Sequence, residues 1–189
     1  IPEARPGNAV VLTIDRQIQR IAEEALDAVT ERSAPESASA VIMDPETGAI
    51  LALAQRPTHN PNNTSLIDQK ALRNRAVADV FEPGSTMKVF TIAAGLESGI
   101  FSPQTEIDTS PGVFKVGKYT ISDHHDFGQI DVTTVITKSS NIGATKIALA
   151  LKPKVFYDFL SKFEFGQTTG SVFPGERTGS LRSFDTWTE

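Results

Sequence analysis

Apolar residues recur every three or four positions in several segments of this 189-residue chain, which is the spacing of one face of an α-helix. The pattern predicts helices over residues 16–31, 69–80, 86–98 and 154–163, and two more within 131–151. The first of them follows Asp15, a residue type that commonly caps a helix N-terminus. In the third, the side chains expected to point inward are Val89, Ile92, Ala93 and Leu96.

Other segments have the composition of strands and loops. Residues 9–14 predict one short strand, and residues 40–54 predict a hairpin with proline and glycine in its turn. Residues 101–130 predict short strands in an irregular segment, and residues 55–68 predict a surface loop. Since a two-stranded hairpin is rarely stable alone, we expect it to join a larger sheet. Its other strands are not found in residues 1–189, which indicates that part of the domain lies elsewhere.

The composition narrows the possible partners. A net charge of −5 without a basic block argues against nucleic acid. The chain has no cysteine, which excludes disulfide bonds and cysteine metal sites. His124 and His125 lie beside Asp123 and Asp126, but paired histidines in a polar loop are usually solvated, so we predict no metal site.

Ser85 and Lys88 stand where the helix over residues 86–98 is predicted to begin. Three positions apart, they lie on nearly the same helix face. A serine hydroxyl needs a base to act as a nucleophile at neutral pH, and lysine can be that base if its pKa is lowered. Burial and the positive end of the helix dipole both lower it. The structural alternative is that Ser85 only caps the helix and Lys88 is only a solvated charge.

A second polar cluster, Ser139-Ser140-Asn141, lies between the two helices predicted within 131–151. A hydroxyl there is suited to relay a proton, and an amide is suited to hold a substrate carbonyl or the lysine. Taken alone, these residues are also typical of a helix-capping turn. Together, the two clusters match the Ser-x-x-Lys and Ser-x-Asn motifs of penicillin-binding proteins and serine β-lactamases.

The resemblance extends beyond the motifs. The segments "RNRAVADVFEPGSTMKVF" and "TKSSNIGATKIALAL" resemble the division-type penicillin-binding transpeptidases, the FtsI group, and "GAILALAQRPTHNPNN" and "FPGERTG" are similar to other segments of that group. This implies an α/β fold like that of the serine β-lactamases, in which helices flank an antiparallel sheet and a helical subdomain carries both motifs. It also implies that residues 1–189 are the N-terminal portion of one transpeptidase domain, with an incomplete sheet.

The resemblance also implies a role for each matched residue. Ser85 would be the acylated nucleophile and Lys88 the general base. Ser139 would relay protons, and Asn141 would position the substrate. Glu82, next to the nucleophile, would line the cleft.

The implied activity is that of a peptidoglycan D,D-transpeptidase, which cross-links stem peptides ending in D-Ala-D-Ala during septal cell-wall synthesis. β-Lactam antibiotics would acylate the same serine, and no metal or organic cofactor is required. The implied partners are membrane proteins of the division machinery, including a septal glycosyltransferase. The implied location is the periplasmic face of the inner membrane, with an N-terminal membrane anchor outside this chain.

One departure from the family pattern is that the third motif, Lys-Thr-Gly or Lys-Ser-Gly, does not occur in the chain. In the family, its strand binds the substrate carboxylate and supplies one oxyanion-hole amide. We therefore expect residues 1–189 alone to be inactive and a C-terminal segment of the same domain to complete the site. Two alternatives stay open. The first is a serine β-lactamase or β-lactam-sensing domain, which the lack of a recognisable deacylating base disfavours. The second is a non-catalytic division scaffold, which the presence of both motifs disfavours.

Overall fold

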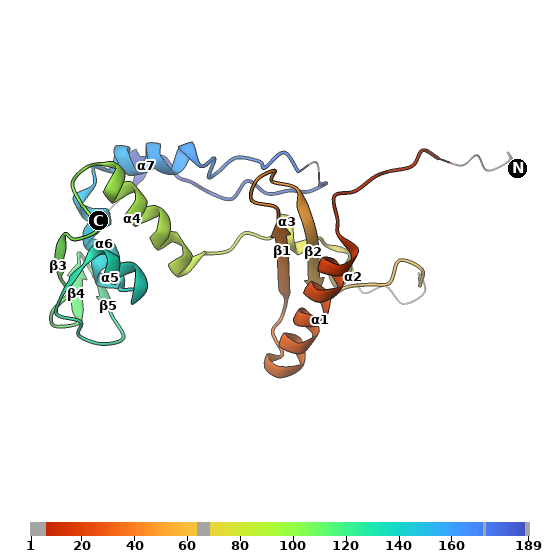
Figure 1. Cartoon of the computed structure of the whole chain (residues 1–189), viewed down its shortest axis with the longest axis horizontal. Helices are drawn as coiled ribbons and strands as arrows, with labels where there is room; N and C mark the ends of the chain where they lie inside the picture. Colours follow the sequence, from red (N-terminus) through yellow and green to blue (C-terminus); the bar gives the residue numbers. More distant parts are fainter. Residues whose placement is uncertain (1–6, 64–68, 172, 188–189) are drawn as a thin grey trace, which may run out of the picture. The chain divides into compact units, whose positions relative to one another are not determined.

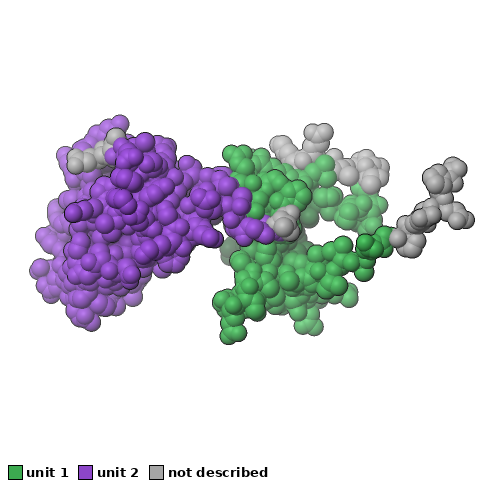
Figure 2. Space-filling view, turned by 90° about the horizontal axis from the view of Figure 1, so that it is seen from above, with its two compact units in different colours: residues 1–79, 173–177 green, residues 80–172, 178–189 purple. Residues whose placement is uncertain are grey.

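The computed structural model describes residues 7–63, 69–171 and 173–187 (Figure 1). The chain divides into two compact units, which Figure 2 shows in different colours. Unit 1 comprises residues 1–79 and 173–177, and unit 2 comprises residues 80–172 and 178–189. Every predicted site residue belongs to unit 2. None of the helices in the described ranges is long and apolar enough to cross a bilayer.

Unit 1 is a helix packed on a two-stranded sheet. α1 (Arg16–Ser33) begins where the sequence predicts, and the Asp15 side chain caps it by accepting hydrogen bonds from the N–H groups of Gln17 and Ile18. β1 (Ala38–Met43) and β2 (Ile50–Arg56) pair antiparallel, which confirms the predicted hairpin. The core between the helix and the sheet consists of Ala22, Leu26, Ala52 and Ala54.

The hairpin turn is stabilised by its own polar side chains. The Asp44 carboxylate accepts hydrogen bonds from the N–H groups of Glu46 and Thr47, at 2.8 and 3.3 Å. These hydrogen bonds hold the pKa of Asp44 below its ordinary value. Gly48 has φ of +73°, a backbone conformation that favours glycine. Just before the turn, the apolar residues 41–43 of β1 are 36–52% exposed.

The predicted strand over residues 9–14 is wrong. The apolar side chains of residues 10–12 are 69–95% exposed, and no strand within the described ranges pairs with this segment. Its end is held to β2 where the N–H of Asp15 donates to the carbonyl of Leu51 at 2.8 Å. A β-rich composition makes a strand only where a neighbouring strand takes up the backbone groups.

The helix predicted over residues 69–80 is two short helices, α2 (Gln69–Leu72) and α3 (Arg75–Ala78). Gln55 of β2 occupies the break between them. Its amide nitrogen donates to the carbonyl of Arg73 at 2.8 Å, and its amide oxygen accepts from the N–H of Arg75 at 2.7 Å. The break depends on the Gln55 side chain, which lies 18 residues or more away in the sequence. The spacing of apolar residues within 69–80 therefore cannot predict it.

Unit 2 contains the remaining helices and two further two-stranded sheets. Its helices, where η marks a 3₁₀-helix, are η2 (Gly84–Met87), α4 (Lys88–Glu97), α5 (Val132–Thr137), α6 (Asn141–Ala150), α7 (Pro153–Lys162) and η3 (Phe184–Thr186). Its strands pair antiparallel as β3 (Glu106–Asp108) with β6 (Gln129–Asp131), and β4 (Val113–Val116) with β5 (Tyr119–Ser122). Its core consists of Ile92, Ile107, Val132, Val135, Ala144 and Ile147. The short strands predicted within 101–130 and the helix predicted over 154–163 are thereby confirmed.

The buried face of α4 differs from the predicted one. Ile92 is buried as expected, but Val89 is 57% exposed and Leu96 is 37% exposed. The buried face instead includes Gly95, where an added Cβ would lie only 2.7 Å from Cγ2 of Ile147 in α6. The two helices therefore cross in close contact at a glycine, which an apolar pattern does not count.

Candidate active site

A tight turn before α4 places Ser85 and Lys88 one turn apart. Gly84 opens this turn with φ of +59°, in the left-handed region. The N–H of Lys88 donates to the carbonyl of Ser85, so the helix predicted over residues 86–98 begins as the 3₁₀-helix η2 and continues as α4. Because residues three apart eclipse one another in a 3₁₀-helix, both side chains leave the backbone on the same side.

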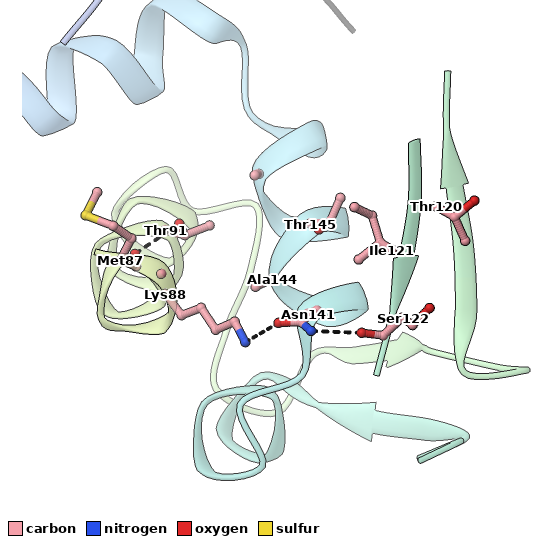
Figure 3. Close-up of a pocket in the computed structure, with 11 residues that line it drawn as sticks. Met87, Lys88, Thr91, Thr120, Ile121, Ser122, Asn141, Ala144 and Thr145 are labelled. Atoms are coloured by element: carbon pink, nitrogen blue, oxygen red, sulfur yellow. Dashed lines mark hydrogen bonds between the residues drawn. The ribbon is translucent and has the colours of Figure 1, made fainter. Parts of the chain in front are cut away.

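The Lys88 amine points toward the second polar cluster (Figure 3). Its Nζ donates to the Ser139 carbonyl at 2.5 Å, to Asn141 Oδ1 at 2.6 Å and to the Ser139 hydroxyl at 3.0 Å. Three of the residues predicted for the site therefore meet at one nitrogen, although more than 50 positions separate the lysine from the other two.

The turn between α5 and α6 brings these acceptors together. Ser139 has φ of +55°, a left-handed conformation that is uncommon for a residue other than glycine. Its N–H donates to the carbonyl of Ile136 at 3.1 Å, which ends α5. This conformation lets Ser139 present both its carbonyl and its hydroxyl to Lys88. The turn is shorter than predicted, because Asn141, which the sequence pattern predicts to lie between the two helices, is the first residue of α6.

Burial lowers the pKa of the Lys88 amine, and the negative charge of Asp123 opposes this effect. The net change is a lowered pKa. A lower pKa makes the neutral amine, the form that can accept a proton, accessible nearer to neutral pH.

Asp123 and Ser122, which the sequence did not single out for the site, hold the start of α6. The Asp123 carboxylate accepts hydrogen bonds from the N–H of Asn141 at 2.5 Å, the N–H of Ile142 at 3.1 Å and the Ser140 hydroxyl at 2.6 Å. The carbonyl of Ser122 accepts from the side-chain amide of Asn141 at 2.8 Å. An aspartate that caps a helix from 18 positions upstream has no local sequence signature.

Ser85 and Glu82 do not join these hydrogen bonds. The Ser85 side chain is exposed, and within the described part of the chain its hydroxyl is not hydrogen-bonded to the Lys88 amine. A catalytic hydrogen bond of this kind often tightens only when substrate binds. Glu82 is also exposed, and neither Glu82 nor Ser85 is among the residues that line the pocket beside the Lys88 amine.

The Lys88 amine lies at a pocket of about 470 Å³, within the size range of small-molecule sites. Residues of η2, α4, β5 and α6 line it, and Figure 3 shows their side chains. Its polar lining includes Lys88, Ser122 and Asn141, together with three threonines. The remaining lining residues are small or apolar, among them Gly84, Met87, Ile121, Ala144 and Ala148.

Comparisons with known proteins agree with this geometry. The family model described as "Penicillin binding protein transpeptidase domain" matches residues 38–189. The "Probable peptidoglycan D,D-transpeptidase PenA" of Neisseria flavescens is 38% identical over 181 residues, which cover 96% of this chain and 45% of that protein. The "Peptidoglycan D,D-transpeptidase FtsI" of Escherichia coli strain K12 is 33% identical over 187 residues, which cover 99% of this chain and 32% of that protein. The chain therefore spans less than half the length of these two relatives.

A solved structure gives the same result. The chain is similar to the "Apo structure of TP domain from Burkholderia pseudomallei penicillin-binding protein 3", with a TM-score of 0.83 and 36% sequence identity. The match covers 97% of this chain and 51% of that one. Together with the three antiparallel strand pairs, this confirms the predicted fold class, including a sheet that is incomplete in the present chain.

Proposed function

Because this chain belongs to the penicillin-binding protein transpeptidase domain family, we propose that it is the N-terminal portion of a peptidoglycan D,D-transpeptidase domain. The relatives named above carry that activity in their names. The observation that supports the proposal most directly is the Lys88 amine, which lies one turn from Ser85 and donates to Ser139 and Asn141. A serine, a lysine of lowered pKa and a second hydroxyl are the groups that acyl transfer through serine requires.

In the proposed reaction, the Ser85 oxygen attacks the carbonyl carbon of the penultimate D-Ala of a stem peptide. The neutral amine of Lys88 takes the hydroxyl proton as the new C–O bond forms. The C–N bond to the terminal D-Ala then breaks, and the leaving nitrogen receives a proton through the Ser139 hydroxyl. An amine of a neighbouring stem peptide next attacks the carbonyl carbon of the ester. The new C–N bond forms the cross-link, the C–O bond to Ser85 breaks, and the proton that the attacking nitrogen loses passes through Lys88 to the Ser85 oxygen.

We propose that the Asn141 side chain both holds the Lys88 amine and positions the substrate. Its oxygen accepts from the Lys88 amine, and its nitrogen is bound to the carbonyl of Ser122. It therefore holds the base and lines the pocket into which we propose the substrate carbonyl binds. Glu82, which does not line this pocket, stays a candidate residue of the larger cleft.

The substrates and partners of the whole protein follow from the same proposal. Stem peptides ending in D-Ala-D-Ala are the substrates, and β-lactams acylate Ser85 as their mimics. A C-terminal segment of the domain supplies the Lys-[Ser/Thr]-Gly strand, which binds the substrate carboxylate and completes the oxyanion hole. The protein acts at the periplasmic face of the inner membrane, with division proteins that include a septal glycosyltransferase.

The test is acylation of the full-length protein by a fluorescent penicillin. We expect one stable adduct, which peptide mapping by mass spectrometry places on Ser85. Ser85→Ala should abolish labelling, whereas Ser98→Ala, at the other end of the same helix region, should not change it. Labelling that persists in Ser85→Ala, or rapid release of hydrolysed penicillin without a lasting adduct, would contradict a transpeptidase.

A further inference from the structure

The groups that accept hydrogen bonds from the Lys88 amine all belong to residues 139–141, between the end of α5 and the first residue of α6. The position of the amine relative to its acceptors therefore depends on how firmly the first turn of α6 is held. The backbone of this turn includes the left-handed Ser139, whose conformation is unfavourable for a side-chain-bearing residue. Contacts from outside the turn must hold it in place.

Asp123 provides three of these contacts from the end of β5. One carboxylate oxygen accepts from the N–H groups of Asn141 and Ile142, which are free donors at the start of a helix. The other oxygen accepts from the Ser140 hydroxyl at 2.6 Å. A negative charge at a helix N-terminus is also favoured by the helix dipole.

The contact with Ser140 fixes a buried hydroxyl. Ser140 is 1% exposed and is the N-cap of α6, where its oxygen accepts from the N–H of Gly143 at 2.9 Å. Because the Ser140 O–H group donates its hydrogen bond to Asp123, the lone pairs of the Ser140 oxygen remain available to that N–H. Loss of the carboxylate would leave a buried donor without its partner, which is costly.

The orientation of the Asn141 side chain follows from the same strand end. The carbonyl of Ser122 can only accept, so the side-chain nitrogen of Asn141 must face it, at 2.8 Å. The side-chain oxygen of Asn141 therefore faces the donor on the opposite side, the Lys88 amine, at 2.6 Å. The backbone N–H of Asn141 donates to Asp123. The backbone and the side chain of Asn141 are therefore held by two consecutive residues, Asp123 and Ser122, at the end of β5.

We propose that Asp123 is a positioning residue of this site, whose carboxylate holds the Ser140–Ile142 turn so that Ser139 and Asn141 meet the Lys88 amine. It acts through these residues and not by contact with substrate. The inference rests on the proposed function only where acylation of Ser85 is its readout. Asp123 also acts on the base through its negative charge, which opposes the lowering of the Lys88 pKa by burial.

The chain offers a matched control for this proposal. Asp126 lies three positions further along the same segment, and its carboxylate accepts from the N–H of Gly128 at 2.9 Å. Within the described residues, none of the Asp126 hydrogen bonds goes to α6. Asp126→Asn therefore tests loss of a carboxylate from the same segment without loss of the contacts that hold the turn.

The kinetic test uses the full-length protein and penicillin acylation. We expect Asp123→Ala to lower the acylation rate constant about 10- to 100-fold, because small displacements of catalytic groups have effects of this size. Asp123→Asn keeps an oxygen for the two N–H groups and should lose less. The final labelling stoichiometry should stay near the wild-type value, as should every parameter of Asp126→Asn. An unchanged rate in Asp123→Ala, or a rate loss matched by an equal loss of labelling stoichiometry, overturns the proposal.

A second readout does not depend on activity. In nuclear magnetic resonance spectra of the full-length protein, Asp123→Ala should shift the amide signals of Asn141 and Ile142 and the side-chain signals of Asn141 and Lys88. Asp126→Asn should leave these four sets of signals in place. If the wild-type protein is not labelled on Ser85, the proposed function fails, while these shifts still support the positioning role. Unchanged Lys88 and Asn141 side-chain signals in Asp123→Ala would overturn the positioning role whether or not the protein is acylated.

Discussion

Lys88 is the residue on which the proposed chemistry depends, and its contacts distinguish the two forms of its amine. Its three acceptors match the three N–H donors of an ammonium group. A neutral amine has two N–H donors and one lone pair, so one contact must reverse. The Ser139 hydroxyl is the one acceptor of the three that can also donate, because the other two are carbonyl oxygens. Deprotonation of Lys88 therefore makes this hydroxyl a donor to the nitrogen, the arrangement that a proton relay needs.

The lowered pKa of Lys88 predicts the pH dependence of acylation. The base works when it has lost its proton, so the rate should rise with pH and level off above the pKa of Lys88. Because burial lowers that pKa more than Asp123 raises it, the midpoint of the rise should lie below the ordinary lysine value of about 10.4. The measurement is the acylation rate of the full-length protein at low penicillin concentration across the range in which it stays folded.

A variant with a side chain that stays protonated at position 88 tests whether Lys88 is the general base. Lys88→Arg keeps the positive charge but is not deprotonated in proteins, so the rise with pH should disappear along with most of the rate. A wild-type midpoint at or above the ordinary lysine value would contradict the proposed base.

At this scale, the sequence predicts a polar residue's role when its partners are close along the chain. Asp15 as a helix cap and the hairpin turn at Asp44 were both predictable, because their side chains bind N–H groups two or three positions away. Ser139 and Asn141 were predictable from the family motif. Asp123 was not, because the groups that it binds lie 17 to 19 positions away and only the fold brings them close.

Among the elements, α6 is the helix against which both α4 and α5 pack next to the site. It touches α4 at Gly95, and it touches α5 at Gly143, where an added Cβ would lie 2.5 and 2.9 Å from the two methyl groups of Val135. These distances are shorter than real Cβ contacts, so a side chain at either glycine would require the facing side chain, Ile147 or Val135, to shift. Close packing of this kind transmits small changes in volume to the neighbouring turn.

Gly143→Ala should therefore destabilise the protein, although alanine is the better helix former. Overpacking a tight contact typically costs about 1–3 kcal/mol, and the gain in helix propensity is at most about 1 kcal/mol. Val135 is fully buried and cannot move aside easily. Thermal unfolding of the full-length protein should show a lower midpoint, and acylation should slow because the Ser140 oxygen lies 3.1 Å from the added methyl.

A double-mutant cycle separates crowding from other effects. Val135→Ala removes the two methyl groups that an alanine at 143 would meet, so the destabilisation by Gly143→Ala should be smaller in that background. Equal effects in both backgrounds would mean that the contact with Val135 is not the cause.

The elements that local patterns predicted well are those with their own start and stop signals, namely α1, the β1–β2 hairpin and α7. The inward face of α4 was predicted less well, because Gly95 decides it through a contact with Ile147. The predicted strand over residues 9–14 was wrong, and the predicted helix over 69–80 was divided, because a neighbouring element decides both outcomes.

At the scale of the whole molecule, the chain carries the proposed nucleophile, base and relay, but it lacks the Lys-Thr-Gly or Lys-Ser-Gly motif of the family. The described strands form three separate pairs, and the two relatives named above are more than twice as long. Under the proposed function, the strand that bears the third motif belongs to a later segment of the protein. That segment would supply the charge for the substrate carboxylate and one of the oxyanion-hole donors.

We therefore expect residues 1–189, produced alone, to be acylated by penicillin at least about 10³-fold more slowly than the full-length protein. The loss of one oxyanion-hole donor already costs about 10²–10³ in rate, and the cationic residue would be lost as well. Intact-mass measurements over time give both rates, and circular dichroism checks that the helices are present. Adduct formation on Ser85 at a rate near that of the full-length protein would show that the third motif is not needed.

The exposed residues 41–43 of β1 have a practical consequence for that experiment. Among the described strands β1 pairs with β2 alone, and a short apolar strand with an open edge is a template on which a second molecule can add its own strand. The isolated piece should consequently self-associate as its concentration rises, and its solubility, more than its chemistry, will set the conditions under which it can be studied.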